Sequence, residues 1–263
     1  MFFLSEFFKC QAIKHLLCDL PIKTIVLKSI DSTNTYCKEL AKNTNKDTLV
    51  VALSQTAGRG RLGRSFHSPK AGVYFSLLLH PSKKATDNLD LTTAAAVAAA
   101  VSCEKISGKK AYIKWVNDIF VDDKKACGIL TEAAAGNNGP YNDYVIIGIG
   151  VNVFTPKNGF PDEIKDIATS LFSSSKEKSG IKAKLIKNIT TLLLDYIKDD
   201  TKQFMNEYKA RSYLDGKKVC FARNGETVTA TVLGIDNDAK LLLKTEDGEE
   251  LSLFAGEVSV QRV

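Results

Sequence analysis

Apolar residues follow two different spacings along this chain. Continuous apolar runs rich in β-branched residues are typical of buried strands. Such runs occupy residues 23–30, 48–54, 72–79, 111–115, 119–121, 126–133 and 144–153. Apolar positions three or four residues apart predict helices instead, and they occur in residues 33–43, 88–107 and 181–198. The chain therefore combines helices and strands in one fold.

The order of these elements indicates the fold class. The run at 119–121 leads into the run at 126–133 across the turn Asp122-Asp123-Lys124. Two strands joined by so short a turn pair as antiparallel neighbours. Several strands thus follow one another without an intervening helix. This order predicts an α+β fold with a mixed, largely antiparallel sheet flanked by helices, rather than a doubly wound parallel sheet.

The pattern changes after Gly216. Short alternating strands are expected at residues 218–223, 227–234, 240–244 and 249–254, separated by turn residues such as Asn224-Gly225 and Asp247-Gly248. Closely spaced strands of this kind predict a small β-barrel of about 50 residues. We therefore expect two domains, residues 1–213 and 214–263.

Composition and charge narrow the class of protein. Hydrophobic residues make up 44% of the chain and the formal net charge is +6, which is ordinary for a globular protein and too mild to indicate nucleic acid. The six cysteines form no CxxC pair, so we expect reduced thiols and a cytoplasmic location. Residues 1–20 are broken by charges and predict a short amphipathic helix rather than a signal peptide. The uncharged stretch 91–101 is too short to cross a membrane.

A loop rich in glycine and arginine is the most informative segment. Gly58, Gly60 and Gly63 alternate with Arg59, Arg61 and Arg64. The spacing resembles a dinucleotide fingerprint and a P-loop, but both motifs require a helix directly afterwards, whereas a strand follows here. Glycines still let backbone N–H groups approach an anion, and arginines donate in pairs to phosphate or carboxylate. We expect an anion-binding loop; the alternative is an exposed loop without a ligand.

Polar residues also interrupt two neighbouring strands. Lys114-Trp115-Val116-Asn117-Asp118 ends one strand, and Lys125 and Gly128 begin the strand across the hairpin. Buried charges without partners are costly, so this cluster indicates a site. A core position for Trp115, and turn capping by Asn117 and Asp118, are the alternatives.

Two further segments carry unusual residue patterns. Asp31-Ser32-Thr33-Asn34 joins a strand to a helix and has more polar residues than capping needs. In Gly148-Ile149-Gly150-Val151-Asn152, glycine occupies alternate strand positions, as expected where another group packs flat against the strand. A β-bulge is the alternative for this segment.

Together these segments resemble the biotin protein ligase family, in that family's order. The resemblance rests on residues 31–34, on Gln55 with the loop 58–64, on Lys114-Trp115-x-Asn117-Asp118, on Lys125-x-x-Gly128-Ile129-Leu130 and on residues 148–152. It covers about residues 23–263, including Gly256-Glu257-Val258-Ser259 near the end of the chain. It implies a fold like the class II synthetases and biotin ligases, with an SH3-like C-terminal barrel.

Two positions depart from the family pattern, because Val116 replaces a proline and Phe66 replaces a tryptophan. Bifunctional members also carry an N-terminal helix-turn-helix that binds DNA. The first strand expected here begins at Lys23. We therefore expect the monofunctional type, without DNA binding or a membrane segment.

The resemblance implies a two-step activity: biotin reacts with ATP to give biotinyl-5'-AMP and pyrophosphate, and biotin then passes to a lysine of a biotin carboxyl carrier protein or domain. Mg²⁺ is expected with ATP, and a homodimer is the alternative to a monomer. The implied catalytic residues are Arg61, Lys125 and Asp118, with Asp118 either a base or a Mg²⁺ ligand. The implied residues for biotin and adenylate are Ser32, Thr33, Asn34, Gln55, Gly58, Arg59, Gly60, Arg61, Arg64, Lys114, Asn117, Lys125 and Gly128.

Electrostatics adds an expectation for the loop. Its three cations repel one another, so it should order around an anionic ligand and act as a lid. Among alternatives, a lipoate ligase would share the fold and the adenylation, but that family's Arg-x-x-Gly-Gly-Gly loop is missing. A nucleic-acid-binding protein would need stacking aromatics or a basic stripe, and after residue 214 only Phe221 and Phe254 are aromatic. A binding protein without activity is disfavoured, because Lys125 and the three arginines are all present.

Overall fold

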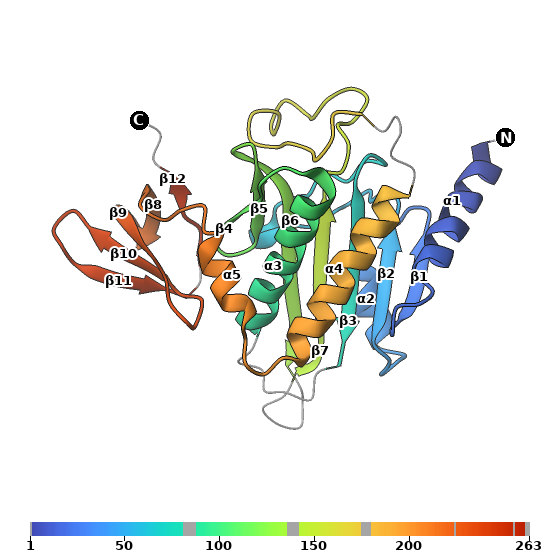
Figure 1. Cartoon of the computed structure of the whole chain (residues 1–263), viewed down its shortest axis with the longest axis horizontal. Helices are drawn as coiled ribbons and strands as arrows, with labels where there is room; N and C mark the ends of the chain where they lie inside the picture. Colours follow the sequence, from blue (N-terminus) through green and yellow to red (C-terminus); the bar gives the residue numbers. More distant parts are fainter. Residues whose placement is uncertain are drawn as a thin grey trace.

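The computed structural model describes residues 2–80, 88–135, 142–174, 180–223, 225–254 and 256–260. A large domain is built around a seven-stranded sheet in the order β1-β2-β3-β7-β6-β5-β4 (Figure 1). Its strands are β1 (Lys23–Leu27), β2 (Thr48–Ala52), β3 (Val73–Leu79), β4 (Tyr112–Lys114), β5 (Asp118–Val121), β6 (Lys124–Ala135) and β7 (Asn142–Val151). The pair β1–β2 is parallel, and the other neighbouring pairs of this sheet are antiparallel. The predicted mixed sheet and the hairpin between β5 and β6 are confirmed.

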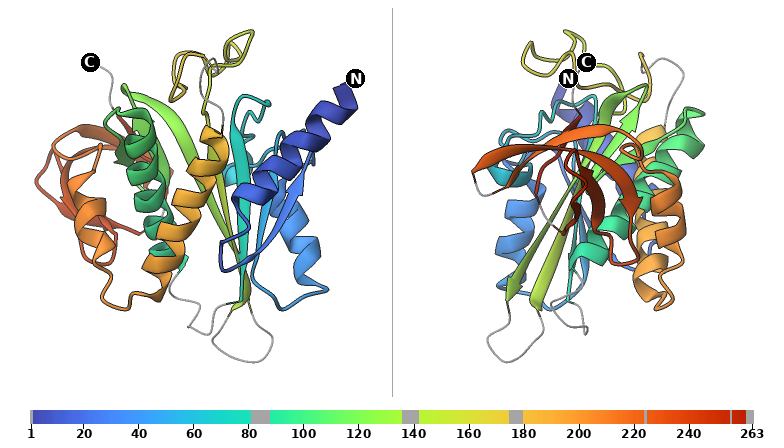
Figure 2. Two further views of the ribbon diagram at one scale, coloured as in Figure 1. Left: turned by 45° about the vertical axis from the view of Figure 1, so that its right-hand side comes forward. Right: turned by 90° about the vertical axis from the view of Figure 1, so that its left-hand side faces the viewer.

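Helices cover both faces of this sheet. They are α1 (Phe2–Leu16), α2 (Thr33–Ala41), α3 (Asn88–Ser107), α4 (Ile181–Lys198) and α5 (Phe204–Ala210). Figure 2 shows α2 on one face, with α3, α4 and α5 on the other. A helix at the N-terminus is confirmed, but its apolar residues do not gather on one face, so the predicted amphipathic character is wrong. The short α5 was not predicted. Among the described residues, no helix is long and apolar enough to cross a membrane.

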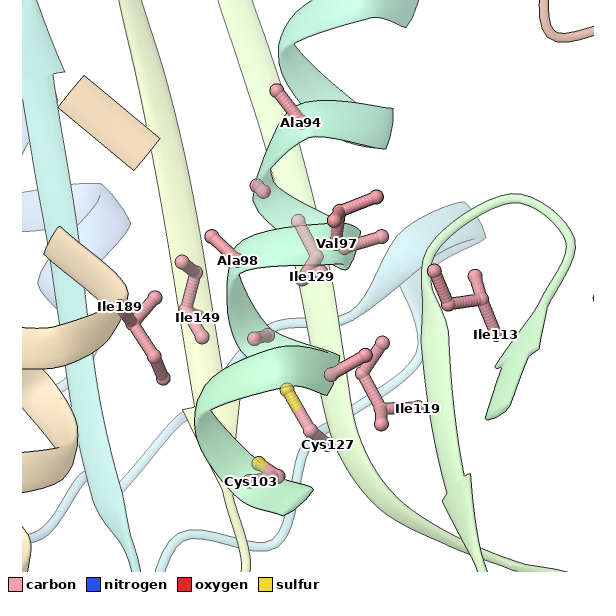
Figure 3. Packing of buried hydrophobic residues seen from close by; sticks show 14 of the residues in the cluster. Ala94, Val97, Ala98, Cys103, Ile113, Ile119, Cys127, Ile129, Ile149 and Ile189 are labelled. Carbon is pink, nitrogen blue, oxygen red and sulfur yellow. The ribbon is translucent and has the colours of Figure 1, made fainter. Parts of the chain in front are cut away.

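Helix α3 forms the centre of the core. Its residues from Ala94 to Ala100 are at most 2% exposed. Small side chains let a helix approach neighbouring elements closely, and α3 packs against α4 on one side and β6 on the other. Figure 3 shows Ala94, Val97 and Ala98 lying over Ile129 and Ile149 of the sheet. Because the middle of α3 is enclosed in this way, its residues from Ala94 to Ala100 are all apolar.

The second domain is a five-stranded antiparallel sheet in the order β11-β10-β9-β8-β12. Its strands are β8 (Lys218–Arg223), β9 (Glu226–Ile235), β10 (Leu241–Thr245), β11 (Glu250–Leu253) and β12 (Ser259–Val260). This confirms the predicted small β domain. It lies at the β4 end of the large sheet, far from α1 (Figure 1). The indole Nε1 of Trp115 donates a buried 2.8 Å hydrogen bond to the Ala239 carbonyl and thereby joins the two domains. Trp115 is therefore a core residue at the domain junction.

Candidate active site

A cavity of about 600 Å³ brings together segments that are far apart in the sequence. It is lined by the start of α2, the loop around residues 55–68, the β5–β6 hairpin, strand β7, residues 161–168 and Glu257 of the second domain. Of the residues that the sequence analysis singled out, those lining the cavity are Ser32, Thr33, Asn34, Gln55, Gly58, Arg59, Gly60, Arg61, Arg64, Asn117, Asp118, Lys125 and Gly128. Most of the expected site therefore lies around one cavity.

Lys114 is the exception, because it does not line this cavity. It pairs with Asp118 across β4 and β5, and its Nζ lies 5.8 Å from the centre of the Phe120 ring. Burial lowers the pKa of Lys114, partly offset by the negative charge of Asp118. Its charge also interacts with Lys125, Glu257 and Arg64, so Lys114 acts electrostatically on the cavity although it does not line it.

Side chains joined by neutral hydrogen bonds form one wall of the cavity, which we call the floor. Ser32, Thr33, Asn34 and Gln55 line the cavity, and Ser76 bonds to this group without lining it. Ser32 caps α2, and its hydroxyl accepts from the Thr35 amide. The Gln55 Oε1 accepts from both the backbone N–H and the hydroxyl of Thr33, at 2.8 and 3.1 Å. Residues 31–34 thus do more than cap the helix.

Ser76 completes the floor from β3. Its fully buried hydroxyl lies 2.7 Å from both Thr33 Oγ1 and Asn34 Oδ1, and its single proton serves one of them at a time. The sequence analysis missed Ser76, since a serine within an apolar strand gave no signal of its own. This network holds the first turn of α2 against the sheet.

The two glycines of β7 admit side chains that pack flat against the strand. A Cβ on Gly148 would lie 2.1 Å from Asn34 Oδ1, and a Cβ on Gly150 would lie 2.6 Å from Phe66 Cε1. The pairing of β7 with β3 and β6 runs through both glycines without a register shift. The interpretation of a flat-packing partner is therefore confirmed, and the alternative of a β-bulge is wrong here.

The arginine loop, residues 58–64, folds back on itself. Phe66 donates its N–H to the Gly58 carbonyl at 2.8 Å, and Gly60 donates to the Arg64 carbonyl at 2.7 Å. Leu62 (φ 53°) and Gly63 (φ 75°) both have left-handed backbone conformations at the tip. A Cβ on Gly58 would lie 2.4 Å from the Phe66 carbonyl oxygen. Glycine is thus required where the two ends of the loop meet.

Each arginine of the loop has a different partner. Arg59 Nη1 lies 3.1 Å from Glu132 Oε2 on β6. Arg61 donates to Asn117 Oδ1 at 2.9 Å and to the Gly256 carbonyl at 3.2 Å. Arg64 pairs with Glu257 at 2.7 Å, and both side chains are exposed. The three cations are thus separated, and two of them contact the second domain.

The hairpin supplies one further cation. Lys125 Nζ lies 2.7 Å from Asp118 Oδ1, with both side chains partly exposed. The backbone of Lys125 pairs with a segment that the sequence analysis missed: its N–H donates to the Ile167 carbonyl at 2.8 Å, and its carbonyl accepts from Thr169 at 2.9 Å. Asn117 bonds Arg61 and the Ile129 carbonyl, so it does more than cap a turn.

Residues 161–168 and Glu257 line the cavity without having been predicted as site residues. Half of the residues in segment 161–168 are charged, which is also typical of an exposed loop, so nothing in the sequence distinguished it as part of a site. Glu257 was part of the family resemblance but had no assigned role. Among the described residues, no group of three or more His, Cys, Asp or Glu side chains could hold a metal ion.

Comparisons with known proteins fit this geometry. Residues 26–152 match the Biotin/lipoate A/B protein ligase family, and residues 216–261 match the Biotin protein ligase C terminal domain. The Bifunctional ligase/repressor BirA of Bacillus subtilis is 38% identical over 224 residues, which cover 83% of this chain and 68% of BirA. The Biotin--[acetyl-CoA-carboxylase] ligase of Paracoccus denitrificans is 35% identical over 130 residues, or 49% of this chain and 53% of that protein.

A solved structure is similar across nearly the whole fold. The biotin protein ligase from Aquifex aeolicus in complex with biotin and ATP superposes with a TM-score of 0.73 at 30% identity, covering 92% of this chain and 99% of that chain. The match to the C-terminal domain and the names of these relatives favour the biotin ligases over the lipoate ligases. Because similarity of this degree extends over most of both chains, this chain belongs to the biotin protein ligase family and is an enzyme of that class.

Proposed function

We propose that this chain biotinylates a carrier protein in two steps. The biotin carboxylate attacks the α-phosphorus of ATP, forming biotinyl-5'-AMP and releasing pyrophosphate. The ε-amine of a carrier lysine then attacks the acyl carbon, forming an amide, losing a proton and releasing AMP. One observation carries this proposal: the arginine loop, Lys125 and the neutral hydrogen-bonding floor all line the same cavity.

The floor suits the ring end of biotin, which carries a urea group with both donors and an acceptor. Ser32 and Thr33 bring hydroxyl groups to the cavity. Gln55 keeps one Nε2 proton, because its Oε1 accepts twice from Thr33 and its Nε2 donates once to Ser68. Asn34 offers less, because its Nδ2 already donates to Glu132 and to the Leu130 carbonyl. We assign to it only the remaining acceptor capacity of Oδ1.

The loop suits the anionic end. Two anions must approach each other in the first step, and cations placed nearby lower the cost of that approach. Arg61 and Arg64 now contact a carbonyl, an amide and an exposed carboxylate. Phosphate is a stronger acceptor than the carbonyl or the amide, and the ion pair with the carboxylate is exposed, so ATP can replace these partners. Lys125 is assigned to the bridge between the biotin carboxylate and the α-phosphate.

Mg²⁺ is expected with ATP, but the described residues do not form a dedicated site for it. Asp118 is a single carboxylate, and it lies beside Lys125. Mg²⁺ in nucleotide sites is commonly held by substrate phosphates and water with only one or two carboxylates.

The second step needs a neutral amine, although free lysine has a pKa of about 10.4. Asp118 lines the cavity and is our candidate to accept the proton that the carrier lysine loses. The carrier we propose is a biotin carboxyl carrier domain. Homodimer formation and the absence of DNA binding stay predictions.

Incubation with radiolabelled biotin tests this function. With ATP and Mg²⁺ alone, we expect labelled adenylate, and addition of a biotin carboxyl carrier domain should move the label onto one carrier lysine. Lipoate in place of biotin, and a carrier domain with that lysine changed to arginine, are the controls. Labelling with lipoate but not biotin, or no adenylate at all, would overturn the proposal.

A further inference from the structure

Glu132 on β6 contacts two parts of the site although it does not line the cavity. Its Oε2 accepts from Asn34 Nδ2 at 2.9 Å and lies 3.1 Å from Arg59 Nη1. Its Oε1 accepts from Lys38 Nζ of α2 at 2.7 Å. Only 19% of the Glu132 side chain is exposed. One carboxylate therefore links the floor, the arginine loop and helix α2.

Asn34 depends on this carboxylate for its orientation. Its Oδ1 lies against Gly148 and 2.7 Å from the Ser76 hydroxyl, so the amide plane cannot shift toward β7. Its Nδ2 donates to Glu132 and, at 3.3 Å, to the Leu130 carbonyl. The side chain is 4% exposed, and water cannot readily replace a lost partner at that depth.

Arg59 depends on the same oxygen for the position of its loop. Unlike Arg61 and Arg64, whose partners include residues of the second domain, it is paired with the large sheet itself. Gly58 and Gly60 on either side are held by backbone hydrogen bonds. The pair with Glu132 thus fixes the first half of the loop, while the second half keeps partners that an anion can displace.

We propose that Glu132 is a positioning residue that preforms the biotin cavity by holding Arg59 and Asn34 at a fixed separation. This inference rests on the proposed function. Groups that orient ligand-contacting side chains commonly change affinity by about 10–100-fold when they are removed. Glu132 should therefore act on biotin binding, and not on the transfer step.

The substitution Glu132→Gln keeps the size of the side chain and an acceptor for Asn34, but removes the charge that attracts Arg59 and Lys38. We expect the biotin dissociation constant, measured by calorimetry, to rise about tenfold or more. The KM for ATP at saturating biotin, and the transfer rate from preformed biotinyl-5'-AMP, should stay within about twofold of wild type. A merely structural role would instead lower the fraction of active enzyme. The rate of adenylate formation and the rate of transfer to the carrier would then fall by the same factor.

Glu39→Gln is the matched control, because Glu39 also pairs with a lysine of the same helix region, Lys42, but lies on the exposed side. It should leave biotin binding unchanged. In an Arg59→Met background, the further effect of Glu132→Gln should fall well below its effect in wild type, since the two residues act together. If Glu132→Gln proves unstable, Glu132→Asp can be measured in its place, in both the wild-type and the Arg59→Met backgrounds.

Two outcomes would overturn this inference while leaving the proposed function intact, provided that wild type makes adenylate. In the first, Glu132→Gln binds biotin as tightly as wild type. In the second, the effects of Glu132→Gln and Arg59→Met on the biotin dissociation constant simply add. If wild type itself binds no biotin and makes no adenylate, the proposed function fails as well.

Discussion

The floor and the arginine loop face each other across one cavity but are stabilised in opposite ways. The floor is buried apart from the partly exposed Gln55, and its neutral side chains bond one another within a single domain, as Thr33 does with Gln55 and Ser76. The loop is largely exposed, and its charged side chains reach residues of β6, the hairpin and the second domain. Arg64 is 68% exposed and its partner Glu257 is 40% exposed.

This difference suggests a division of labour. Buried neutral hydrogen bonds are geometrically strict and costly to break, so the floor should recognise one shape. Exposed ion pairs contribute only about 0.2–1 kcal/mol each and are screened by salt, so an anionic ligand can replace them at little cost. Rigid recognition and adaptable charge neutralisation therefore belong to separate walls of the cavity. Five substitutions or conditions test that contrast.

Removing a loop cation should have the largest effect. In Arg61→Ala the cavity loses a cation and the contacts to Asn117 and Gly256, so the adenylate should form but escape before transfer. We expect its release rate to rise about a hundredfold, comparable to removal of one electrostatic donor in other active sites. Rapid filtration of enzyme-bound radiolabelled adenylate measures this rate. Release equal to wild type would show that the loop does not retain the intermediate.

Asp118 is a charged group that belongs to neither wall. In Asp118→Asn the carboxylate that could accept a proton is lost while the size is kept, so transfer from preformed adenylate should slow by about tenfold to a hundredfold. Single-turnover transfer to the carrier domain checks this, with adenylate formation measured alongside. Unchanged transfer would eliminate the base role of Asp118.

Overfilling the floor should reduce both stability and biotin affinity. A methyl group at Gly148 would press on the buried Asn34 amide at 2.1 Å, at a cost of about 1–3 kcal/mol. Gly128→Ala is the comparison, because there the nearest atoms, at 3.0–3.2 Å, belong to side-chain ends of Phe66 and Lys125. Thermal unfolding and biotin calorimetry should rank Gly148→Ala as the more damaging. The reverse order would contradict a rigid floor.

Acid should weaken the link between floor and loop. Burial raises the pKa of Glu132, but hydrogen bonds from Lys38 and Asn34 and the charge of Arg59 outweigh it, so the pKa lies below its ordinary value. Its contribution to the free energy of unfolding is therefore present above about pH 4.3 and lost as the pH falls through the lowered pKa. The difference in unfolding free energy between wild type and Glu132→Gln, about 1 kcal/mol, should be constant at neutral pH and shrink below that point. If the difference in unfolding free energy grew in acid instead, the pKa of Glu132 would be raised rather than lowered, and this prediction would be wrong.

The exposed pair at the second domain should matter least. Glu257→Gln removes the partner of Arg64, and the free energy of unfolding should change by no more than about 0.5 kcal/mol. Any change should vanish between about 0.1 M and about 1 M salt, where the screening length falls from about 10 Å to about 3 Å. Denaturant titration at both salt concentrations measures it. A large loss of unfolding free energy that did not depend on salt would show that Glu257 contributes like a buried residue of the floor and not like an exposed ion pair of the loop.

Much of the fold could be predicted from local patterns. The α3 and α4 helices begin and end where their apolar spacing predicts, and the turn 122–124 is enough to make β5 and β6 antiparallel. Strand β1 ends at Leu27, before the predicted residue 30, and beyond it Ile30 forms only an isolated bridge with Gln55. Helix α5 was missed because a seven-residue segment is too short for a clear apolar period.

What the sequence alone determined is the chemistry available: the glycines, arginines, lysine and hydroxyl groups occur in motifs whose residue types indicate an anion site and resemble one family. What only the tertiary structure decided is which polar atoms are already in use. The Asn34 amide already bonds Ser76 and Glu132, Lys114 does not line the cavity, and residues 161–168 complete it. A motif records residue types along one segment, whereas hydrogen-bond satisfaction depends on partners that are close in space and distant in the chain.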